Sequence, residues 1–486
     1  MVLALVALLA PGEMGVAGEA QDEGAFVLYP QLVLHGAVAQ RDFQTYYGPG
    51  FSWLVAAGYL VGGASQAVER LVSLVVIALV GLTLVALVAR IAPRGVAIIS
   101  ALVVLPLAWS FPLAGPWLAA TALAVGSLLA LCSSTDRPLS RSMLVLGGML
   151  AALSLSFRPD MVPAIALSAL PLILGRRSRA FWYGAGATLG IIPLAVHVLV
   201  ATPSNFFQHF LVDAIRASPG RVLPVPPVGA VDRVAFVLAL GSVALALAAA
   251  VTAWRRWGGT GTSRALASVA LLSVGFLIQA LQRDDAVHTV TAEIVAIGWV
   301  PVSLWILLPL RRVGEWRHRV GLLAAVVALG CGTVAATAIR INQSAGISVS
   351  NQGRAFVVHT ALAADTQAAL REVDRVAKPG QSIFVGPADL RRTNYDDTFL
   401  YFLLPQLRPG TRYLEMEPLN ANRSDSGLAS DMARTDVLVL TSTWDSWSEP
   451  NRSSQLGSSV PNEIVDKHFC AVALVGPYRV LIRCTP

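Results

Sequence analysis

Long apolar runs follow one another along the first 340 residues, and short polar segments rich in Arg, Gly and Pro separate them. A membrane-spanning helix needs about 20 mostly apolar residues, so this pattern predicts a series of spans. The segment at 2–10 is too short to span, which suggests a native start site further upstream. The Gly- and Ala-rich segment at 50–64 predicts a re-entrant or interfacial helix. The other predicted helices cover residues 66–90, 95–112, 114–132, 141–157, 159–175, 180–202, 232–254, 264–282, 288–310 and 319–340.

The pattern changes after residue 340. Polar stretches with helical periodicity, such as 360–377, alternate there with short apolar runs at 382–386, 436–442, 470–476 and 478–484. Alternation of strands and helices is typical of a small α/β unit. The sequence therefore predicts a membrane domain at 1–340 and an α/β domain at 341–486.

The arginines in the loops predict the orientation of the chain. If the N-terminus is cytoplasmic, the loop at 11–65 lies outside, and the short inner loops carry about twice as many arginines as the longer outer loops. Basic residues in short loops mark the cytoplasmic side. The predicted fold class is a polytopic α-helical membrane protein of about 11 spans with a C-terminal extracytoplasmic α/β domain. The predicted location is a bacterial plasma membrane.

Composition excludes several other classes of protein. Of the 486 residues, 55% are hydrophobic and 13% are charged, which is unlike a soluble domain. The net charge of +7 comes from arginines clustered in short loops, with no basic helix that alternates with aromatic residues, so no nucleic-acid partner is expected. The sequence has no P-loop, no GxGxxG after a strand, no GxSxG and no HExxH motif.

The cysteines fit an extracytoplasmic C-terminal domain. Cys470 and Cys484 flank a predicted hairpin that turns near Gly476 and Pro477, so their side chains are expected to face each other across two antiparallel strands. Outside the cytosol we expect a disulfide there. No spacing of the cysteines indicates a metal site or a nucleophile.

Acidic residues gather on the predicted outer side. The first outer loop contains Asp22, Glu23 and Asp42, and the junctions FRPD (157–160) and QRDDAVH (282–288) fall on the same side, with Glu293 shortly after. A charged side chain within a span costs about 2.5–3.5 kcal/mol on insertion scales, so such residues usually face a partner or a water-filled cavity. We therefore predict one shared polar cavity at the outer boundary of the membrane.

Local structure offers another explanation for each of these residues. Asp160 can cap the helix that begins at Met161 or pair with Arg158. Asp284 can bridge to His288, four residues later. The argument for a shared cavity therefore rests on the clusters falling together on one side, which the arginine pattern predicts independently.

Carboxylates, arginines and a histidine at a membrane surface suit the transfer of a group from a lipid phosphate to a hydroxyl. The acceptor hydroxyl must lose a proton, which a carboxylate within hydrogen-bond reach can take. The leaving group is a phosphate, which the planar fork of an arginine binds well. A lipid donor enters from the bilayer, which accounts for a site at its edge.

The first outer loop, DEGAFVLYPQLVLHGAVAQRDFQTYYGPG, resembles that of the GT-C superfamily of polytopic glycosyltransferases that use polyprenyl-phosphate sugars. Its features are an Asp-Glu pair after the first span, an amphipathic helix ending in His-Gly, and the later Arg-Asp-Phe and Tyr-Gly-Pro-Gly. FRPD, the 283–288 junction and the extracytoplasmic tail are similar to those of bacterial members of the ArnT-like, protein-mannosyltransferase-like and RgtA-like kinds. The chain departs from the family pattern in its short first span.

The resemblance implies an inverting transfer to a cell-envelope acceptor hydroxyl, with a first-loop carboxylate as the general base. By position Asp22 is that base, and Glu23 and Asp42 orient the acceptor or donor. Arg158 and Arg283 are the candidates for binding phosphate, and His288 is a candidate for a hydrogen bond to phosphate or sugar. The full set of substrate- and phosphate-binding candidates is Arg158, Asp160, Arg283, Asp284, His288 and Glu293.

The implied partners are a polyprenyl-phosphate sugar donor, a cell-envelope glycan or lipid acceptor, and membrane lipids. The identity of the sugar and of the acceptor is not readable from the sequence. No cofactor is certain; oxygen ligands from Asp22, Glu23 and Asp42 suit a divalent cation, Mg²⁺ or Mn²⁺, although no spacing demands one.

Two other functions stay open at this point. A secondary transporter or lipid flippase with a polar outer vestibule would also have many spans, although such proteins tend to show internal repeats and polar groups near the midplane. A sensor or scaffold could carry the same outer domain, although it would need far fewer spans.

Overall fold

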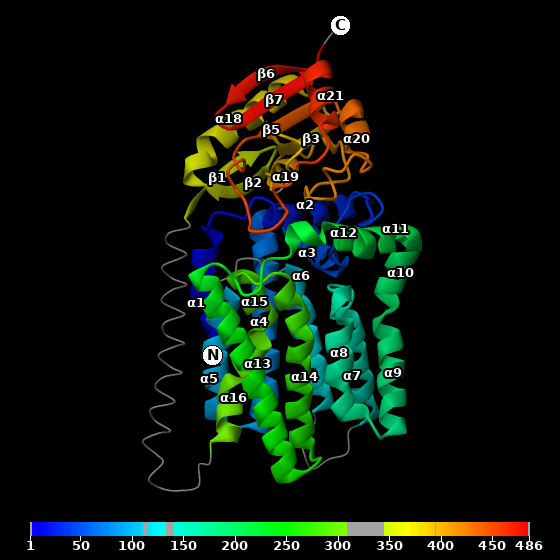
Figure 1. The fold of residues 1–486 in the computed structure, drawn as a ribbon, viewed down its shortest axis with the longest axis vertical. Coiled ribbons are helices and arrows are strands. Elements are labelled where there is room, and N and C mark those ends of the chain that lie inside the picture. The colour runs from blue at the N-terminus through cyan, green and yellow to red at the C-terminus, as the bar shows by residue number, and fades with distance from the viewer. Residues whose placement is uncertain (1, 110–114, 133–139, 309–344, 394, 485–486) are drawn as a thin grey trace.

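The computed structural model describes residues 2–109, 115–132, 140–308, 345–393 and 395–484. Upright helices form one part of the molecule and a sheet region forms the other (Figure 1). Between them lie α2 (Asp22–Leu34), α11 (Pro203–Phe207) and α12 (Asp213–Arg221).

The helices of the apolar part follow the predicted runs. The predicted spans at 180–202 and 288–310 are each two helices, bent by 41° and 57°. The predicted helix at 319–340 and the domain boundary at 340 lie outside the described residues. The helices are α1 (Val2–Met14), α3 (Gly50–Gly62), α4 (Gln66–Ile91), α5 (Arg94–Trp109), α6 (Gly115–Leu131), α7 (Arg141–Ser154), the 3₁₀ turn η1 (Pro159–Met161), α8 (Val162–Ile173), α9 (Arg177–Gly190), α10 (Ile192–Ala201), the π-helical turn η2 (Gln208–Val212), α13 (Ala230–Trp257), α14 (Gly261–Gln282), α15 (Ala286–Ala292) and α16 (Ile294–Leu307).

Several of these helices suit a bilayer. Within the described residues, α4, α13 and α14 are long and apolar enough to cross a membrane, and each bent pair adds one more if it is a single span. On α13, Val231, Val234 and Val237 are exposed, whereas the small side chains of Ala235 and Ala239 are buried. Branched side chains outside and small ones inside are what a lipid-facing, closely packed helix needs. The structure is thus mostly helical with several apolar helices, and the count of 11 spans stays a prediction.

The first-loop helix α2 is buried and does not have the expected amphipathic character. Every residue from Glu23 to Gln31 is buried. Phe26 belongs to the core of the apolar helices, and Val27, Leu28 and Tyr29 belong to a core shared with the C-terminal sheet. A helix that is apolar on all sides packs inside a protein, and α2 joins the two parts of the molecule.

The C-terminal part contains a five-stranded sheet in the order β4-β3-β5-β7-β6 and a separate β1–β2 hairpin. β3 runs parallel to β4 and β5, and β7 is antiparallel to β5 and β6. The four predicted strands and the helix at 360–377 are confirmed, while the hairpin, β4 and three short helices were not predicted. The elements are β1 (Gly346–Asn351), β2 (Arg354–His359), α18 (Thr360–Val376), β3 (Ser382–Pro387), α19 (Phe399–Leu403), β4 (Arg408–Pro409), α20 (Leu428–Arg434), β5 (Val437–Thr441), α21 (Val460–His468), β6 (Phe469–Val475) and β7 (Tyr478–Arg483).

A disulfide joins Cys470 to Cys484, whose Cα atoms are 5.0 Å apart. The expected register is wrong in detail, because Cys470 lies opposite Ile482 rather than opposite Cys484. A register shift between Ala471 and Ala473 makes the hairpin irregular. The two cysteines are therefore diagonal neighbours at the ends of β6 and β7, which is still within disulfide reach.

Candidate functional site

A cavity of about 100 Å³ lies where α2, the α7–η1 junction and α15 come together. Asp22 reaches it from the start of α2, Arg158 from the FRPD junction and His288 from α15. Three of the predicted site residues, from segments more than 100 residues apart in the chain, thus share one cavity. We call it the site cavity; its lining is Asp22, Phe26, Tyr47, Gly115, Pro116, Trp117, Arg158, Gln279, Val287, His288, Thr291 and Ala292.

Asp22 is half-buried at the first position of α2. Its backbone N–H donates to the Glu19 carboxylate. Among the described residues, no side chain donates a hydrogen bond to the Asp22 carboxylate or forms an ion pair with it. Asp22 is therefore an acceptor beside the cavity that is available to a ligand.

Arg158 lies between aromatic rings. Its guanidinium carbon is 4.7 Å from the centroid of Trp117 and 5.7 Å from that of Tyr47. The Nε atom donates to Asp160 Oδ1 at 2.9 Å, and Nη2 donates to Gln279 Oε1 at 3.2 Å. The ring contacts and the hydrogen bonds hold the planar guanidinium of Arg158 in one orientation. The side chain therefore loses little conformational entropy when it binds an anion. Asp160 thus pairs with Arg158, and its side chain caps no helix.

The two motifs YYGPG and SFRPD lie against each other. The Gly48 N–H donates to the Phe157 carbonyl at 3.0 Å, and the Gly50 N–H donates to the Ser156 carbonyl at 2.8 Å. A Cβ at position 48 would lie 2.2 Å from the Ser156 oxygen. Gly48 therefore does more than form a turn, because its missing side chain lets the first loop approach the backbone that carries Arg158.

We expect Gly48→Ala to disturb the site. The new methyl group must push the Ser156–Phe157 backbone away, which costs about 1–3 kcal/mol of stability and displaces Arg158. The measurement is the thermal unfolding of the purified full-length protein, together with its affinity for a polyprenyl phosphate. Gly15→Ala is the control, because a Cβ there meets nothing within 4 Å; equal behaviour of the two variants would contradict the packing argument.

His288 is held by Asp285 rather than by the expected Asp284. Its Nδ1 lies 2.8 Å from Asp285 Oδ2, and its backbone N–H donates to Asp285 Oδ1 at 2.9 Å, which caps α15. Burial raises the pKa of Asp285, but the His288 ring, its hydrogen bonds and Arg283 outweigh this and hold the pKa at about 2. The ionised Asp285 fixes a proton on Nδ1 and leaves Nε2 for a ligand.

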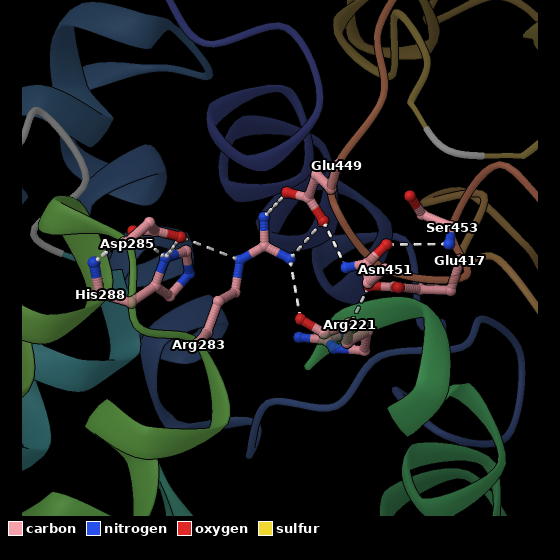
Figure 2. A network of polar contacts seen from close by, with 8 residues as sticks. All are labelled: Arg221, Arg283, Asp285, His288, Glu417, Glu449, Asn451 and Ser453. Carbon is pink, nitrogen blue, oxygen red and sulfur yellow. Dashed lines mark hydrogen bonds and ion pairs between the residues drawn. The ribbon is translucent and has the colours of Figure 1, made fainter. Parts of the chain in front are cut away.

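Arg283 lies between two carboxylates rather than in the site cavity. Figure 2 shows Asp285 on one side of its guanidinium and Glu449, from the C-terminal part, on the other. The distance from Nε to Asp285 Oδ2 is 3.3 Å, and the two Nη atoms bond to Glu449. Asn451 donates to the Glu449 carboxylate at 3.0 Å. This network ties the α14–α15 turn to the C-terminal part.

A second link involves Arg221, at the end of α12. It forms an ion pair with Glu417 at 2.5 Å, and its guanidinium carbon is 4.7 Å from the centroid of Tyr46. Glu415, two residues before Glu417, accepts a hydrogen bond from Tyr29 at 2.8 Å. Burial and the nearby Asp22 and Glu417 carboxylates raise the pKa of Glu415 well above its usual range. These glutamates were not predicted, because they lie nearly 400 residues from Asp22 in the chain.

Glu23 and Asp42 do not line the site cavity. Glu23 is buried against Arg70 at 2.7 Å, and Asp42 is exposed and paired with Arg41 at 2.7 Å. Within the described parts of the chain, no three acidic, His or Cys side chains come together as metal ligands. Asp22, Glu23 and Asp42 therefore do not fit a shared Mg²⁺ or Mn²⁺ site.

Asp284 and Glu293 are also outside the site cavity. Glu293 is fully buried at the bend between α15 and α16, and Asp284 is only 1% exposed. No described group forms a hydrogen bond with either carboxylate. The expected pairing of Asp284 with His288 is wrong, because Asp285, one position later, points its carboxylate at the ring.

Comparison with solved structures identifies the fold. The chain is similar over 99% of its length to ArnT from Cupriavidus metallidurans bound to undecaprenyl phosphate, with a TM-score of 0.62, 12% identity and 97% of that chain covered. It is also similar to the archaeal oligosaccharyltransferase AglB from Archaeoglobus fulgidus, in complex with an inhibitory peptide and a dolichol-phosphate, with a TM-score of 0.53, 10% identity and 73% of that chain covered. No protein-family model matches the sequence, and a search of curated proteins finds no significant match.

These likenesses confirm the expected GT-C resemblance at the level of the fold. The chain has the membrane fold of ArnT and AglB, with apolar helices followed by a C-terminal part outside the helical bundle. At such low identity the fold is what is shared, and the chemistry of this chain must be argued from its own residues.

Proposed function

We propose that this protein transfers a sugar, with inversion, from a polyprenyl-phosphate donor to a hydroxyl group of a cell-envelope acceptor on the extracytoplasmic side. The observation that carries the proposal is that Asp22, Arg158 and His288 line one cavity. A carboxylate without a protein partner, an oriented guanidinium and a histidine with a fixed proton are the groups that such a transfer needs.

The fold supports a lipid-linked donor. Of its structural neighbours, ArnT is bound to undecaprenyl phosphate, and AglB is in complex with a dolichol-phosphate. Both ligands carry a phosphate on a long isoprenoid chain. Arg158 suits such a phosphate in the present chain, because its guanidinium is positioned by Trp117, Asp160 and Gln279 before any ligand binds.

The roles follow from the chemistry of the reaction. Asp22 takes the proton of the acceptor hydroxyl while the hydroxyl oxygen forms a bond to the anomeric carbon of the sugar. The bond between that carbon and the phosphate oxygen breaks, and the polyprenyl phosphate leaves with the electron pair. Arg158 donates to the leaving phosphate and stabilises the charge that develops on it, and His288 does the same in the form that also carries a proton on Nε2.

The direct test uses purified full-length protein with radiolabelled polyprenyl-phosphate sugars and a cell-envelope fraction. We expect free polyprenyl phosphate and a labelled envelope product to form in equal amounts. Movement of an intact lipid across a vesicle membrane, without cleavage of the sugar–phosphate bond, would instead identify a transporter or flippase and overturn the proposal.

Arg158→Lys tests the phosphate role. Lysine keeps the charge but loses the fork and the ring stacking, so we expect the KM for the donor to rise roughly 10–100-fold, as for the loss of one or two charged hydrogen bonds. Steady-state kinetics with a range of donor concentrations measure the change. Arg434→Lys, at an exposed position of α20, is the control, and an unchanged KM in the Arg158 variant would remove Arg158 from the donor site.

A further inference from the structure

A second and larger cavity adjoins the site cavity. Its volume is about 560 Å³, and it lies between the Pro-rich segment at 223–229, the α14–α15 turn and the loop at 447–450 of the C-terminal part. Asp285 lines this cavity, while its partner His288 lines the site cavity. One side-chain pair therefore separates the two spaces.

The larger cavity has a distinct charge. Four carboxylates line it, those of Asp232, Asp284, Asp285 and Glu449, and none of its lining residues is Arg, Lys or His. We call it the acidic cavity. An anion such as a phosphate would find no Arg, Lys or His among the lining residues to bind it, so the cavity is unsuited to the head of the lipid donor.

Three of the four carboxylates already have partners. Asp232 accepts the N–H of Ala286 at 2.8 Å. Asp285 is paired with His288 and Arg283, and Glu449 with Arg283 and Asn451 (Figure 2). Their charges are largely compensated by these contacts within the protein.

Asp284 is the exception. Its side chain is 1% exposed, and neither carboxylate oxygen has a hydrogen-bond partner among the described residues. A buried carboxylate without donors is costly, and proteins usually satisfy it with a partner. Asp284 lines the cavity, but protein atoms cover both of its oxygens, so a ligand inside the cavity supplies the missing donors only once the covering groups move.

The other residues that line the acidic cavity indicate what kind of molecule supplies these hydrogen-bond donors. Trp447 and the rings of Pro224, Pro227 and Pro450 also line the acidic cavity. Apolar rings beside a few hydrogen-bond acceptors suit a molecule with both C–H faces and O–H edges, which describes a sugar ring. The volume lies within the range of about 300–1,000 Å³ that is usual for small-molecule sites.

We propose that the acidic cavity binds a neutral sugar residue of the acceptor, with two of its hydroxyl groups donating to the Asp284 carboxylate. This inference rests on the proposed function, since it names the acceptor side of the same reaction. The site cavity, at about 100 Å³, has no room for both substrates, whereas the acidic cavity lies directly behind the Asp285–His288 pair. A sugar held there presents a free hydroxyl toward the donor.

The test measures binding without any donor. Saturation-transfer NMR on the full-length protein in detergent uses methyl hexopyranosides and a methyl arabinofuranoside as probes, with cyclohexanol, inorganic phosphate and a methyl aminohexoside for comparison. We expect at least one neutral glycoside to bind, and to bind roughly 10–100-fold more weakly to Asp284→Asn, in line with the loss of charged hydrogen bonds.

A second variant tests the acidic cavity in case Asp284→Asn does not fold. Ser448 is exposed at the wall of the acidic cavity, so Ser448→Trp fills the space from outside the core, and Ser446→Trp, at an exposed position that does not line it, is the matched control. We expect Ser448→Trp to abolish glycoside binding and transfer to the envelope fraction, and Ser446→Trp to change neither.

The outcomes separate this inference from the proposed function. Glycoside binding that Ser448→Trp abolishes supports the acidic cavity even if the wild type cleaves no donor, in which case the proposed function alone fails. Transfer that survives in Ser448→Trp overturns the inference and leaves the proposed function in place. Equal binding of cyclohexanol, competition by phosphate, or binding of the aminohexoside alone would also overturn it.

Discussion

Replacing Asp22 with Asn is expected to lower the rate of sugar transfer by about 10²–10⁴-fold, the usual contribution of a general base. The amide has nearly the same shape but cannot accept the proton of the acceptor hydroxyl. Because no described side chain bonds to the Asp22 carboxylate, the change breaks no contact within the protein, and stability should be unaffected.

The measurement is the initial rate with a radiolabelled polyprenyl-phosphate sugar, alongside the affinity for the unlabelled lipid. The expected pattern is a reduced kcat with little change in donor affinity, since Arg158 keeps its partners Asp160 and Gln279. Asp466→Asn, at an exposed position of α21, serves as the matched control. A variant of Asp22 that retains wild-type turnover would exclude it as the base.

Replacing Arg70 with Met is expected to lower the free energy of unfolding by about 3–5 kcal/mol, as when one partner of a buried pair is removed. Arg70 is 6% exposed, and it joins three segments. Its Nε donates to Glu23 at 2.7 Å, while Nη1 donates to the carbonyl oxygens of Glu13 and Val16 at 2.7 and 3.0 Å. The variant leaves the buried Glu23 carboxylate without its ion-pair partner. It also removes the hydrogen bonds to Glu13 and Val16, which precede α2 in the chain.

Unfolding in mixed detergent micelles, followed by circular dichroism, measures this loss. Arg41→Met is the matched control. The Arg41–Asp42 pair lies in the same first outer loop as Glu23, and both of its side chains are about 40% exposed. Exposed ion pairs stabilise a protein little. Adding Glu23→Leu to Arg70→Met should recover part of the loss, because the Glu23 carboxylate is then no longer buried without its partner. Losses that simply add in the double variant would show that the two side chains do not act as a pair.

The sequence was a good guide to the elements of the fold. Apolar runs near the length of a bilayer predicted the long helices, since a backbone in hydrocarbon must satisfy its own hydrogen bonds. Alternating runs predicted the strands β3, β5, β6 and β7, of which β3 and β5 are buried along their length. The hairpin β1–β2 was not predicted, although Ile347, Ser348, Val349 and Ser350 of β1 alternate between apolar and polar.

The sequence also brought attention to the right segments of the site, but not always to the right residue. Asp22, Arg158 and His288 were predicted and share a cavity. Glu23, one residue from Asp22, lies on the other side of α2, because neighbouring residues of a helix point about 100° apart. Asp284 and Asp285, in the turn between α14 and α15, also point in different directions, and only Asp285 faces the histidine.

By itself, then, the sequence determined which segments form apolar helices, which part of the chain forms a sheet, and which short motifs carry charge. These are local properties, set by hydropathy and by the period of each element. Only the tertiary structure decided that α2 lies buried between the two parts, that Glu449 from the C-terminal part pairs with Arg283, and that Asp284 lies unpartnered in a second cavity. Such contacts join residues separated by up to several hundred positions, and their distances depend on the packing of every element between them.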